Sequence, residues 1–429
     1  LAGVNFVVAG DDPAFRDLAR IEGRSISIMR KKPDGTRALL HEGLTTDVRR
    51  DGEKAIIAEI RKGGAAEGIT ISARKQETSD GGSAVTAGTG DLTAGELMRL
   101  SGSTFSGIDP KMQVVVTFTS RLSSKGALME TGVSVAARNG HVVPPDPDMP
   151  SFDLDEAALD LRMRPDAPDV MIDRLQVRFA ETNFLLNGSL SPIPGANGDV
   201  RLKLKADRAD LDRLSASEAP LALDFAEAEG VISANLRSLT LESLRIREDA
   251  GELAVAGRYS LDGGGLMATN LEGRNFDLRK ALRVWPVWVA PNVRRWIVDH
   301  AESGMLASIS LQSELAGEVL KDAFSHRPIP DGALRVAYQL DDVKLRPVLD
   351  AAPVSGMSAT GLSTGRRAEV DIAKAYVEPK PGQRFEISGA KIRVANTSLR
   401  PALLELSIPA QGRLDGLIIS HCRICPRDL

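Results

Sequence analysis

Short segments in which apolar and charged residues alternate recur through most of this 429-residue chain. Val200-Arg201-Leu202-Lys203-Leu204-Lys205 is one example, and Leu334-Arg335-Val336-Ala337-Tyr338 is another. Successive side chains of a β-strand point to opposite faces of the sheet, so each segment presents one aliphatic face and one charged face. The recurrence of such segments at roughly 8–12-residue spacing predicts a mainly β, antiparallel architecture with a few short helices.

Glycine and proline clusters mark the places where the alternation stops. Pro192–Gly195 and Asp262–Gly265 predict turns, and the Gly/Ser/Thr/Ala stretch at 81–90 predicts a loop. Four prolines within Pro144–Pro150 remove backbone donors and fix φ, so this segment predicts a domain boundary. We therefore expect a β-rich segment at 1–143, sheet segments at 151–272 and 305–416, a helical insertion at 273–304 and an off-pattern tail at 417–429.

One strand pattern changes phase in the middle. The large apolar residues before the change, Leu334, Val336, Tyr338 and Leu340, occupy even positions, whereas Val343 and Leu345 occupy odd positions. An extra residue in one strand of a pair restores both sets to the same face. The sequence therefore predicts a β-bulge or a tight turn at Asp341-Asp342.

An Asp-Leu pair opens a short helical pattern at three places, beginning at Asp91, Asp210 and Asp277. The separations are unequal, which argues against a fixed-period solenoid. We expect short helices that punctuate a long sheet, the first of them within 91–100.

The last of these helices precedes Trp285-Pro286-Val287-Trp288-Val289-Ala290-Pro291, and we expect a second helix at 292–301. Pro291 suits the first helical position, where its missing N–H costs nothing. Gly304 is the expected left-handed cap. The spacing places one apolar face on Val293, Trp296, Ile297, His300 and Ala301, with Arg294, Arg295 and Asp299 on the other side. This helix either anchors on the sheet or plugs or bends its apolar wall.

Composition excludes several classes of function. Lysine and arginine total 54 and aspartate and glutamate total 58, so the formal net charge is −4 and there is no basic excess for nucleic acid. Aromatic residues make up 4% of the chain, too few for stacking platforms that hold bases or sugars. Hydrophobic residues make up 42%, which indicates a folded protein rather than a disordered one.

Cysteine usage and the chain start bear on location. Cys422 and Cys425 are the two cysteines, so no disulfide scaffold holds the body of the chain, and cysteine avoidance suits an oxidising periplasm. No stretch approaches the roughly 18 apolar residues of a membrane-spanning helix, and no secretory signal opens the chain. The chain begins with Leu1 and reaches a predicted strand at Val4–Val8. We therefore expect an internal piece of a longer protein.

No motif predicts catalysis, a metal or a cofactor. Histidines at 41, 141, 300, 326 and 421 lack the spacing of a metal pair, and Cys422 and Cys425 with His421 lack a fourth zinc ligand. The acidic set Asp146, Asp148, Asp153 and Asp155 does not match a Ca²⁺ loop. Residues 88–91 lack the Lys-Ser/Thr end of a phosphate loop, and no Gly-x-Ser-x-Gly elbow occurs. We therefore expect a non-enzymatic protein.

The run from Asp277 to His300, followed by Gly304, resembles the central region of the YhdP-type members of the AsmA-like envelope proteins. The residues that carry the resemblance are Trp285, Pro286, Pro291, Arg295, Trp296 and Gly304. The pattern after them is also similar, at Gly332–Leu340, Asp342–Leu345 and Pro353–Gly356. The resemblance extends over 150–420 and is best at 270–400.

This resemblance implies a long, curled antiparallel sheet that forms a taco-like groove lined with aliphatic side chains. Proteins of this family are anchored in the inner membrane of Gram-negative bacteria, cross the periplasm and conduct phospholipid toward the outer membrane. The implied partners are phospholipid acyl chains and, through a segment outside this chain, the inner membrane. The expected groove lining is Leu202, Leu204, Leu253, Val255, Leu334, Val336, Val370, Ile372, Ile392 and Val394.

The alternation by itself is compatible with more than one architecture. Each acyl CH₂ that moves from water onto a dry aliphatic track gains about 0.8 kcal/mol, so a lipid chain is retained there yet slides. The same pattern also makes a filled sandwich, which is a structural envelope protein with a closed core and no lipid transport. A carbohydrate-active β-structure enzyme is a third reading, and the low aromatic content counts against it.

Overall fold

The computed structural model describes most of the chain between residues 20 and 411 and shows a mainly β protein, with 68% of it in strands. The described residues are 20–31, 36–52, 55–62, 69–101, 109–142, 152–196, 198–214, 218–285, 290–325, 327–347, 352–396 and 403–411. The strand predicted at Val4–Val8, the prolines of 144–150 and the tail at 417–429 lie outside them. The chain divides into two units, 1–143 with 151–177 and 144–150 with 178–429.

The first unit is an antiparallel meander in which each long strand pairs with the next. Its strands are β1 (Arg20–Lys31), β2 (Arg37–Arg50), β3 (Ala55–Lys62), β4 (Ile69–Glu77), β5 (Ser83–Thr89), β6 (Leu92–Thr93), β7 (Gln113–Leu122), β8 (Leu128–Val142) and β9 (Phe152–Met163). The short strand β6 pairs with β7 beside β5. The division between the units falls inside β10 (Val170–Phe179).

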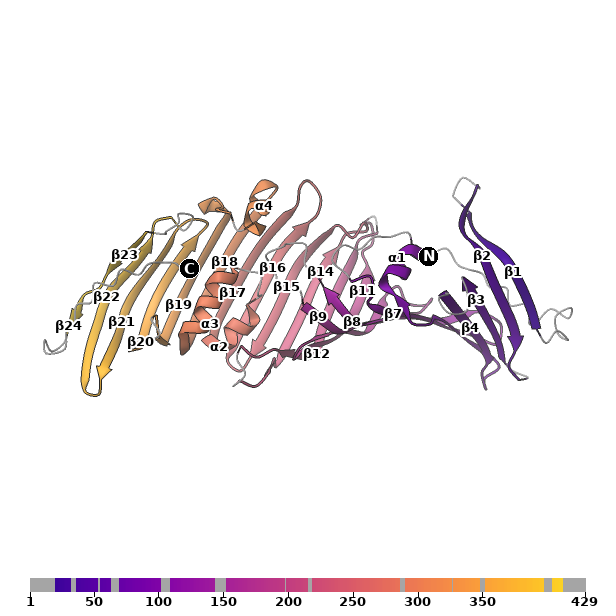
Figure 1. Ribbon diagram of the computed structural model, residues 1–429, viewed down its shortest axis with the longest axis horizontal. Coiled ribbons are helices and arrows are strands. Elements are labelled where there is room, and N and C mark those ends of the chain that lie inside the picture. The colour runs from indigo at the N-terminus through magenta and orange to yellow at the C-terminus, as the bar shows by residue number, and fades with distance from the viewer. Residues whose placement is uncertain are drawn as a thin grey trace. The chain divides into compact units, whose positions relative to one another are not determined.

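The second unit follows the same rule over more strands. They are β11 (Thr182–Pro192), β12 (Val200–Leu211), β13 (Leu221–Ala222), β14 (Phe225–Ile232), β15 (Ser238–Glu248), β16 (Gly251–Ser260), β17 (Leu266–Asp277), β18 (Ala301–Ala316), β19 (Leu334–Leu345), β20 (Val354–Thr364), β21 (Ala368–Lys380), β22 (Gln383–Val394), β23 (Leu404–Ser407) and β24 (Ala410–Gln411). Figure 1 shows the long strands side by side in chain order. Among the described residues no pairing joins β11 to β22–β24, so this sheet is open.

The register confirms the predicted bulge at Asp341-Asp342. The pairing of β19 with β20 shifts between Leu340 and Val343, and Asp342 has a left-handed φ of 50°. In β20, Gly356 has a φ of 59° at the point where the pairing with β21 also shifts. Glycine tolerates this backbone region without steric cost, and aspartate is one of the few other residues that adopt it. Each extra residue returns the following apolar side chains to the same face of the sheet.

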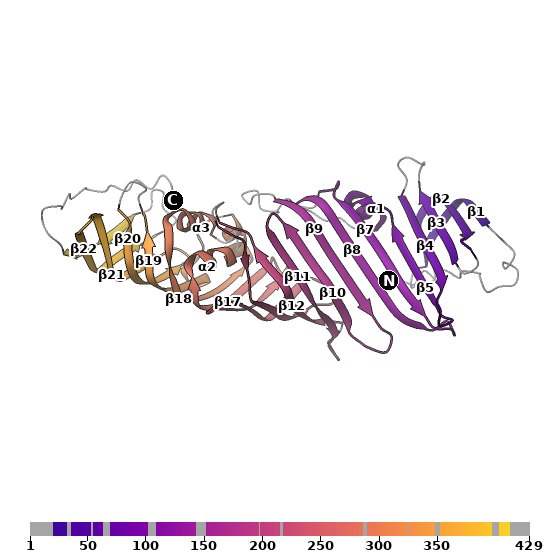
Figure 2. The same cartoon turned by 90° about the horizontal axis from the view of Figure 1, so that it is seen from below.

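The described part of the second unit contains the helices α2 (Leu278–Val284), α3 (Pro291–His300) and α4 (Glu318–Phe324) and a 3₁₀ turn at Asp331–Ala333. In both views α2 and α3 lie beside β17 and β18 (Figures 1 and 2). Asp277 is the N-cap of α2, since its carboxylate accepts a hydrogen bond from the backbone N–H of Lys280. Pro291 opens α3, as the sequence predicts.

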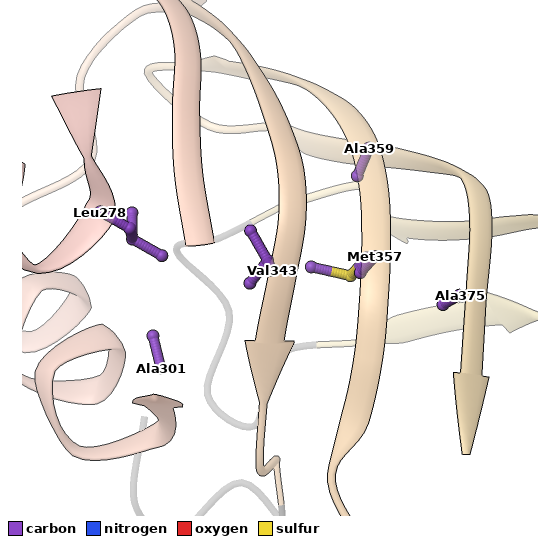
Figure 3. Packing of buried hydrophobic residues seen from close by; sticks show 6 residues of the cluster. All are labelled: Leu278, Ala301, Val343, Met357, Ala359 and Ala375. Carbon is purple, nitrogen blue, oxygen red and sulfur yellow. The ribbon is translucent and has the colours of Figure 1, made fainter. Parts of the chain in front are cut away.

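A buried apolar cluster joins these helices to the sheet. Leu278 of α2 packs with Ala301, Val343 and Met357, and Val343 is only 2% exposed. Figure 3 shows the side chains of Leu278 and Met357 both directed toward Val343, one from the helix and one from the neighbouring strand. Ala359 and Ala375 complete the cluster, because their small side chains admit close packing across β20 and β21.

The first unit has a smaller core of the same design. The helix α1 (Ala94–Ser101) begins with a capping box, in which Thr93 Oγ1 accepts from the N–H of Glu96 while Glu96 Oε2 accepts from the N–H of Thr93 at 2.7 Å. Ala94 packs with Met112, just before β7, and with Val114 of β7. The helix expected within 91–100 is therefore present, and its first turn lies against the strands.

Three local predictions are wrong. Residues 81–90 are not a loop, because Ser83–Thr89 forms β5 between β4 and β7. No helix follows Asp210, because Leu211 ends β12 as a buried strand residue. Gly304 is not the cap of α3; the helix passes directly into β18 at Ala301, and Gly304 lies inside that strand where a Cβ would meet Val343. In each case strand pairing overrides a local signal.

Candidate functional site

The aliphatic face of the second unit is the candidate site, and strand register assigns its residues. Leu204 lies opposite Ala228, and the same row continues across consecutive strands. Its members are Leu204, Ala228, Leu244, Val255, Leu271, Leu311, Val336, Ser363, Ala368, Val394 and Leu404. A parallel row contains Leu253, Gly273, Ile309, Tyr338, Gly361, Val370, Ile392 and Leu406. Side chains in register on one face form a continuous surface.

All ten residues predicted to line a groove fall on this face. Leu204, Val255, Val336 and Val394 belong to the first row, and Leu253, Val370 and Ile392 belong to the second. Leu202, Leu334 and Ile372 lie in the flanking rows, opposite Gly230, Ser313 and Ala359. Each of the ten side chains is half-buried rather than buried. The face is therefore partly open to solvent along these positions.

The opposite face carries the charges. Lys203 pairs with Glu229 at 3.4 Å, Arg245 with Glu227 at 3.3 Å, and Lys391 with Asp371 at 3.6 Å. All of these are cross-strand neighbours, and exposed ion pairs of this kind contribute little to stability. These charged side chains instead distinguish the two faces of the sheet, because they keep one face in water and leave the other face apolar.

Aromatic rings cover glycines on the aliphatic side. A Cβ at Gly361 would lie 2.0 Å from the Tyr338 ring, so Tyr338 folds over the bare backbone of β20. Gly251 lies under Phe276 in the same way. Burial raises the pKa of the Tyr338 hydroxyl above its ordinary value of 10.0. The few aromatic residues of this chain thus fill gaps in the sheet surface rather than form a stacking platform.

The helices α2 and α3 cover one end of this face. Leu278 is buried against Val343, and Ile297 of α3 packs against the same cluster. Val370 and Ile372 border that cluster. The ten residues predicted to line a groove therefore extend along the aliphatic face up to the part that the helices cover. The packing of Leu278 and Ile297 attaches both helices to the sheet, and it covers this end of the aliphatic face.

Charged side chains attach α2 to the rest of the unit. Arg279 donates to Glu218 Oε1 at 2.6 Å, and Arg283 donates to Glu218 Oε2 at 2.8 Å. Burial acts to raise the pKa of the Glu218 carboxyl, but these two guanidinium groups outweigh it, and the pKa lies below its ordinary value. Lys280 forms ion pairs with Asp249 and with the buried carboxylate of Glu248. The distance from Lys280 Nζ to Glu248 Oε1 is 2.5 Å.

Arginine side chains also cap the ends of both helices. Arg279 donates to the carbonyl oxygens of Val298 and Ala301 at 2.8 and 3.1 Å, at the end of α3. Arg294 donates to those of Leu282 and Trp285 at 3.0 and 3.1 Å, at the end of α2. These carbonyl groups lack partners within their own helices, so the arginines satisfy them. The sequence reading placed Arg294 away from the packing side and missed this role.

The residues that carry the family resemblance have different surroundings. Trp285 and Trp296 are half-buried, and the Trp296 ring stacks on His300 with centroids 4.8 Å apart. Arg295 is exposed, Gly304 lies in β18, and Val293 of the expected apolar face is 51% exposed. Pro286 and the side chain of Pro291 lie outside the described part of the structure. Two residues of the apolar face predicted from the helical period, Ile297 and Ala301, do belong to the packing side, because Ala301 is part of the buried cluster and Ile297 packs against it.

Within the described ranges, no group of three or more His, Cys, Asp or Glu side chains is arranged as a metal site requires. His141 pairs with Asp153 at the surface, and His300 bonds the Trp296 carbonyl through Nδ1 at 2.7 Å. Within the same ranges, every helix is too short or too polar to cross a bilayer. Comparison with models of protein families, with curated proteins and with solved structures finds no match to this chain.

Proposed function

We propose that the aliphatic face of the second unit holds phospholipid acyl chains and conducts them along the sheet. In this proposal the chain is a segment of an inner-membrane-anchored protein of the YhdP-type, AsmA-like kind, which crosses the periplasm and carries phospholipid toward the outer membrane in a taco-like groove. It is not an enzyme, and it uses no cofactor.

One observation supports this proposal above the others. The two rows that contain Val336 and Val370 run across successive strands, and from β12 to β22 their Leu, Ile and Val side chains remain half-buried. Neighbouring strands lie about 4.8 Å apart, so a row that crosses ten strands extends roughly 45 Å. An aliphatic surface of that length loses free energy when apolar chains displace water from it. Acyl chains are an occupant whose chemistry matches a long, uncharged row.

Site-specific photo-crosslinking in cells tests the proposal directly. Crosslinkers at Val336 and Val255 should capture phospholipid, whereas crosslinkers at Arg335 and Lys203 should not. Val336 and Arg335 form the sharpest pair, because they are adjacent in β19 and point to opposite faces. Equal labelling at both positions would reject the assigned facing.

A structural envelope protein with a closed core is the second candidate, and the cluster beneath α2 and α3 favours it. There the chain's own helices, not a ligand, cover the aliphatic side chains of β18–β20. Purification distinguishes the two candidates. Protein from cells should carry phospholipid that organic extraction recovers if the half-buried rows hold acyl chains, and it should be free of lipid if they serve only for packing.

A further inference from the structure

Three hydroxyl groups interrupt the aliphatic face in β16, β17 and β18. Thr269 lies directly opposite Gly257 on one side and Ser313 on the other. The ring of Tyr259 folds over Gly257, since a Cβ built there would lie 2.8 Å from the Tyr259 hydroxyl oxygen. That oxygen lies 3.3 Å from Thr269 Oγ1. The hydroxyls of Tyr259, Thr269 and Ser313 therefore stand side by side, and we call them the hydroxyl row.

The hydroxyl row borders the half-open part of the face. On one side of it lies the row of Tyr259, Met267 and Leu315, in which Leu315 is buried and Met267 is half-buried. On the other side, Val255, Leu271 and Leu311 form the next row, about 7 Å away along the strands. After one more row the face reaches Phe276, which is 3% exposed beside α2. Across these three strands two aliphatic rows therefore lie between the hydroxyl row and the helix.

The hydroxyl groups of the hydroxyl row require hydrogen-bond partners. A hydroxyl donates one hydrogen bond and accepts others, and an unpaired one in apolar surroundings is costly. Tyr259 and Thr269 share one contact, and within the described ranges Ser313 has no side-chain hydrogen bond. A pure hydrocarbon on the two aliphatic rows would displace water from the hydroxyl row and leave these groups unpaired. A ligand that carries oxygen atoms at one end of its acyl chains would pair with them instead.

We propose that the hydroxyl row binds the ester and phosphate oxygens of a phospholipid whose acyl chains lie across β16–β19 on the two adjacent aliphatic rows. This inference rests on the proposed function and adds the orientation of the lipid. One leaflet of a bilayer core is about 15 Å thick, so one acyl chain spans about three strand spacings. No charged side chain belongs to the hydroxyl row, so zwitterionic and anionic phospholipids should bind equally well.

The test combines two photoreactive phospholipids with hydroxyl-deleted protein. One probe carries a diazirine at the glycerol–phosphate end and the other at the acyl terminus, and both are supplied to the purified chain in vesicles of phosphatidylethanolamine and phosphatidylglycerol. The variant is Tyr259→Phe, Thr269→Val, Ser313→Ala, which keeps side-chain volume nearly constant. A diazirine-bearing alkane reports the aliphatic rows alone. The matched control is Thr240→Val with Thr360→Val, because both threonines are exposed on the charged face of the same sheet.

The head-labelled probe should map to β16–β18 at the hydroxyl row, and its affinity should fall about tenfold in the triple variant. Alkane labelling and the control variant should remain as in the original protein. Unchanged head labelling in the triple variant, with acyl labelling still at Val255 and Leu311, would overturn the hydroxyl row and leave the proposed function intact. The absence of any phospholipid labelling in the unaltered protein would overturn both.

Discussion

Arg279 and Arg294 cap each other's helices. Arg279 extends from α2 to the last carbonyl groups of α3, and Arg294 extends from α3 to the last carbonyl groups of α2. A cation at a helix C-terminus is also favoured by the helix dipole. The two short helices are therefore held as one body over the sheet, although each has too few turns to be stable alone.

Replacing Arg294 tests this reciprocal capping. Arg294→Ala should lower the free energy of unfolding by about 2–3 kcal/mol, because two carbonyl groups lose hydrogen bonds from a charged donor. Amide exchange in α2 and α3 should accelerate with it. Arg295→Ala is the matched control, since Arg295 is the next residue and is exposed, and its effect should stay within about 0.5 kcal/mol. Equal effects of the two variants would contradict the capping role.

The attachment of α2 should weaken in acid through Glu218. Its pKa in the folded protein is lower than its ordinary value of 4.5, so the unfolded state binds the proton more readily. The stabilisation is fully present above pH 4.5 and is lost as the pH falls through the folded pKa. Denaturation of the original protein and of Glu218→Gln between pH 3 and pH 7 isolates this term from other carboxylates. The two stabilities should converge in acid, and a constant difference would exclude the linkage.

A charge should destabilise the protein much less at Val336 than at Val343, although both valines belong to β19. Val336→Asp should block lipid passage and cost about 1 kcal/mol or less, because a half-buried position hydrates the carboxylate. Val343→Asp should cost at least about 3 kcal/mol, because Val343 is enclosed by Leu278 and Met357. Chemical denaturation of the purified variants measures both. Global unfolding by Val336→Asp would favour the closed-core candidate.

Deleting Asp342 should disrupt the core more than replacing it. Without this residue Val343 and Leu345 turn to the charged face, since a shift of one residue inverts a strand. We expect a loss of several kcal/mol and exposure of the cluster beneath α2, seen as binding of a hydrophobic dye. Asp342→Gly, by contrast, should change stability by no more than about 1 kcal/mol, because glycine accepts the positive φ. A tolerated deletion would show that the bulge does not set the register.

The alternation of side chains predicted most of what is local. It located many of the strands, the shared face of the ten residues predicted to line a groove and the phase change at Asp341-Asp342, because strand geometry fixes side-chain direction with a period of two. Local signals failed where pairing decided the outcome. Ser83–Thr89 has the composition of a loop, yet it lies between β4 and β7 and completes their ladders. Leu211 is buried at the end of β12 and continues into no helix.

The order of residues along the chain was thus sufficient to give this protein an aliphatic and a charged side, because that division needs only the pleat of each strand. Tertiary structure decided which part of the aliphatic side stays accessible. Arg279 reaches Glu218 across 61 positions of sequence, and Leu278 meets Val343 and Met357 only after three strands have paired. Such contacts depend on distances between segments, which no periodicity encodes. The placement of α2 and α3 over one end of the sheet follows from them.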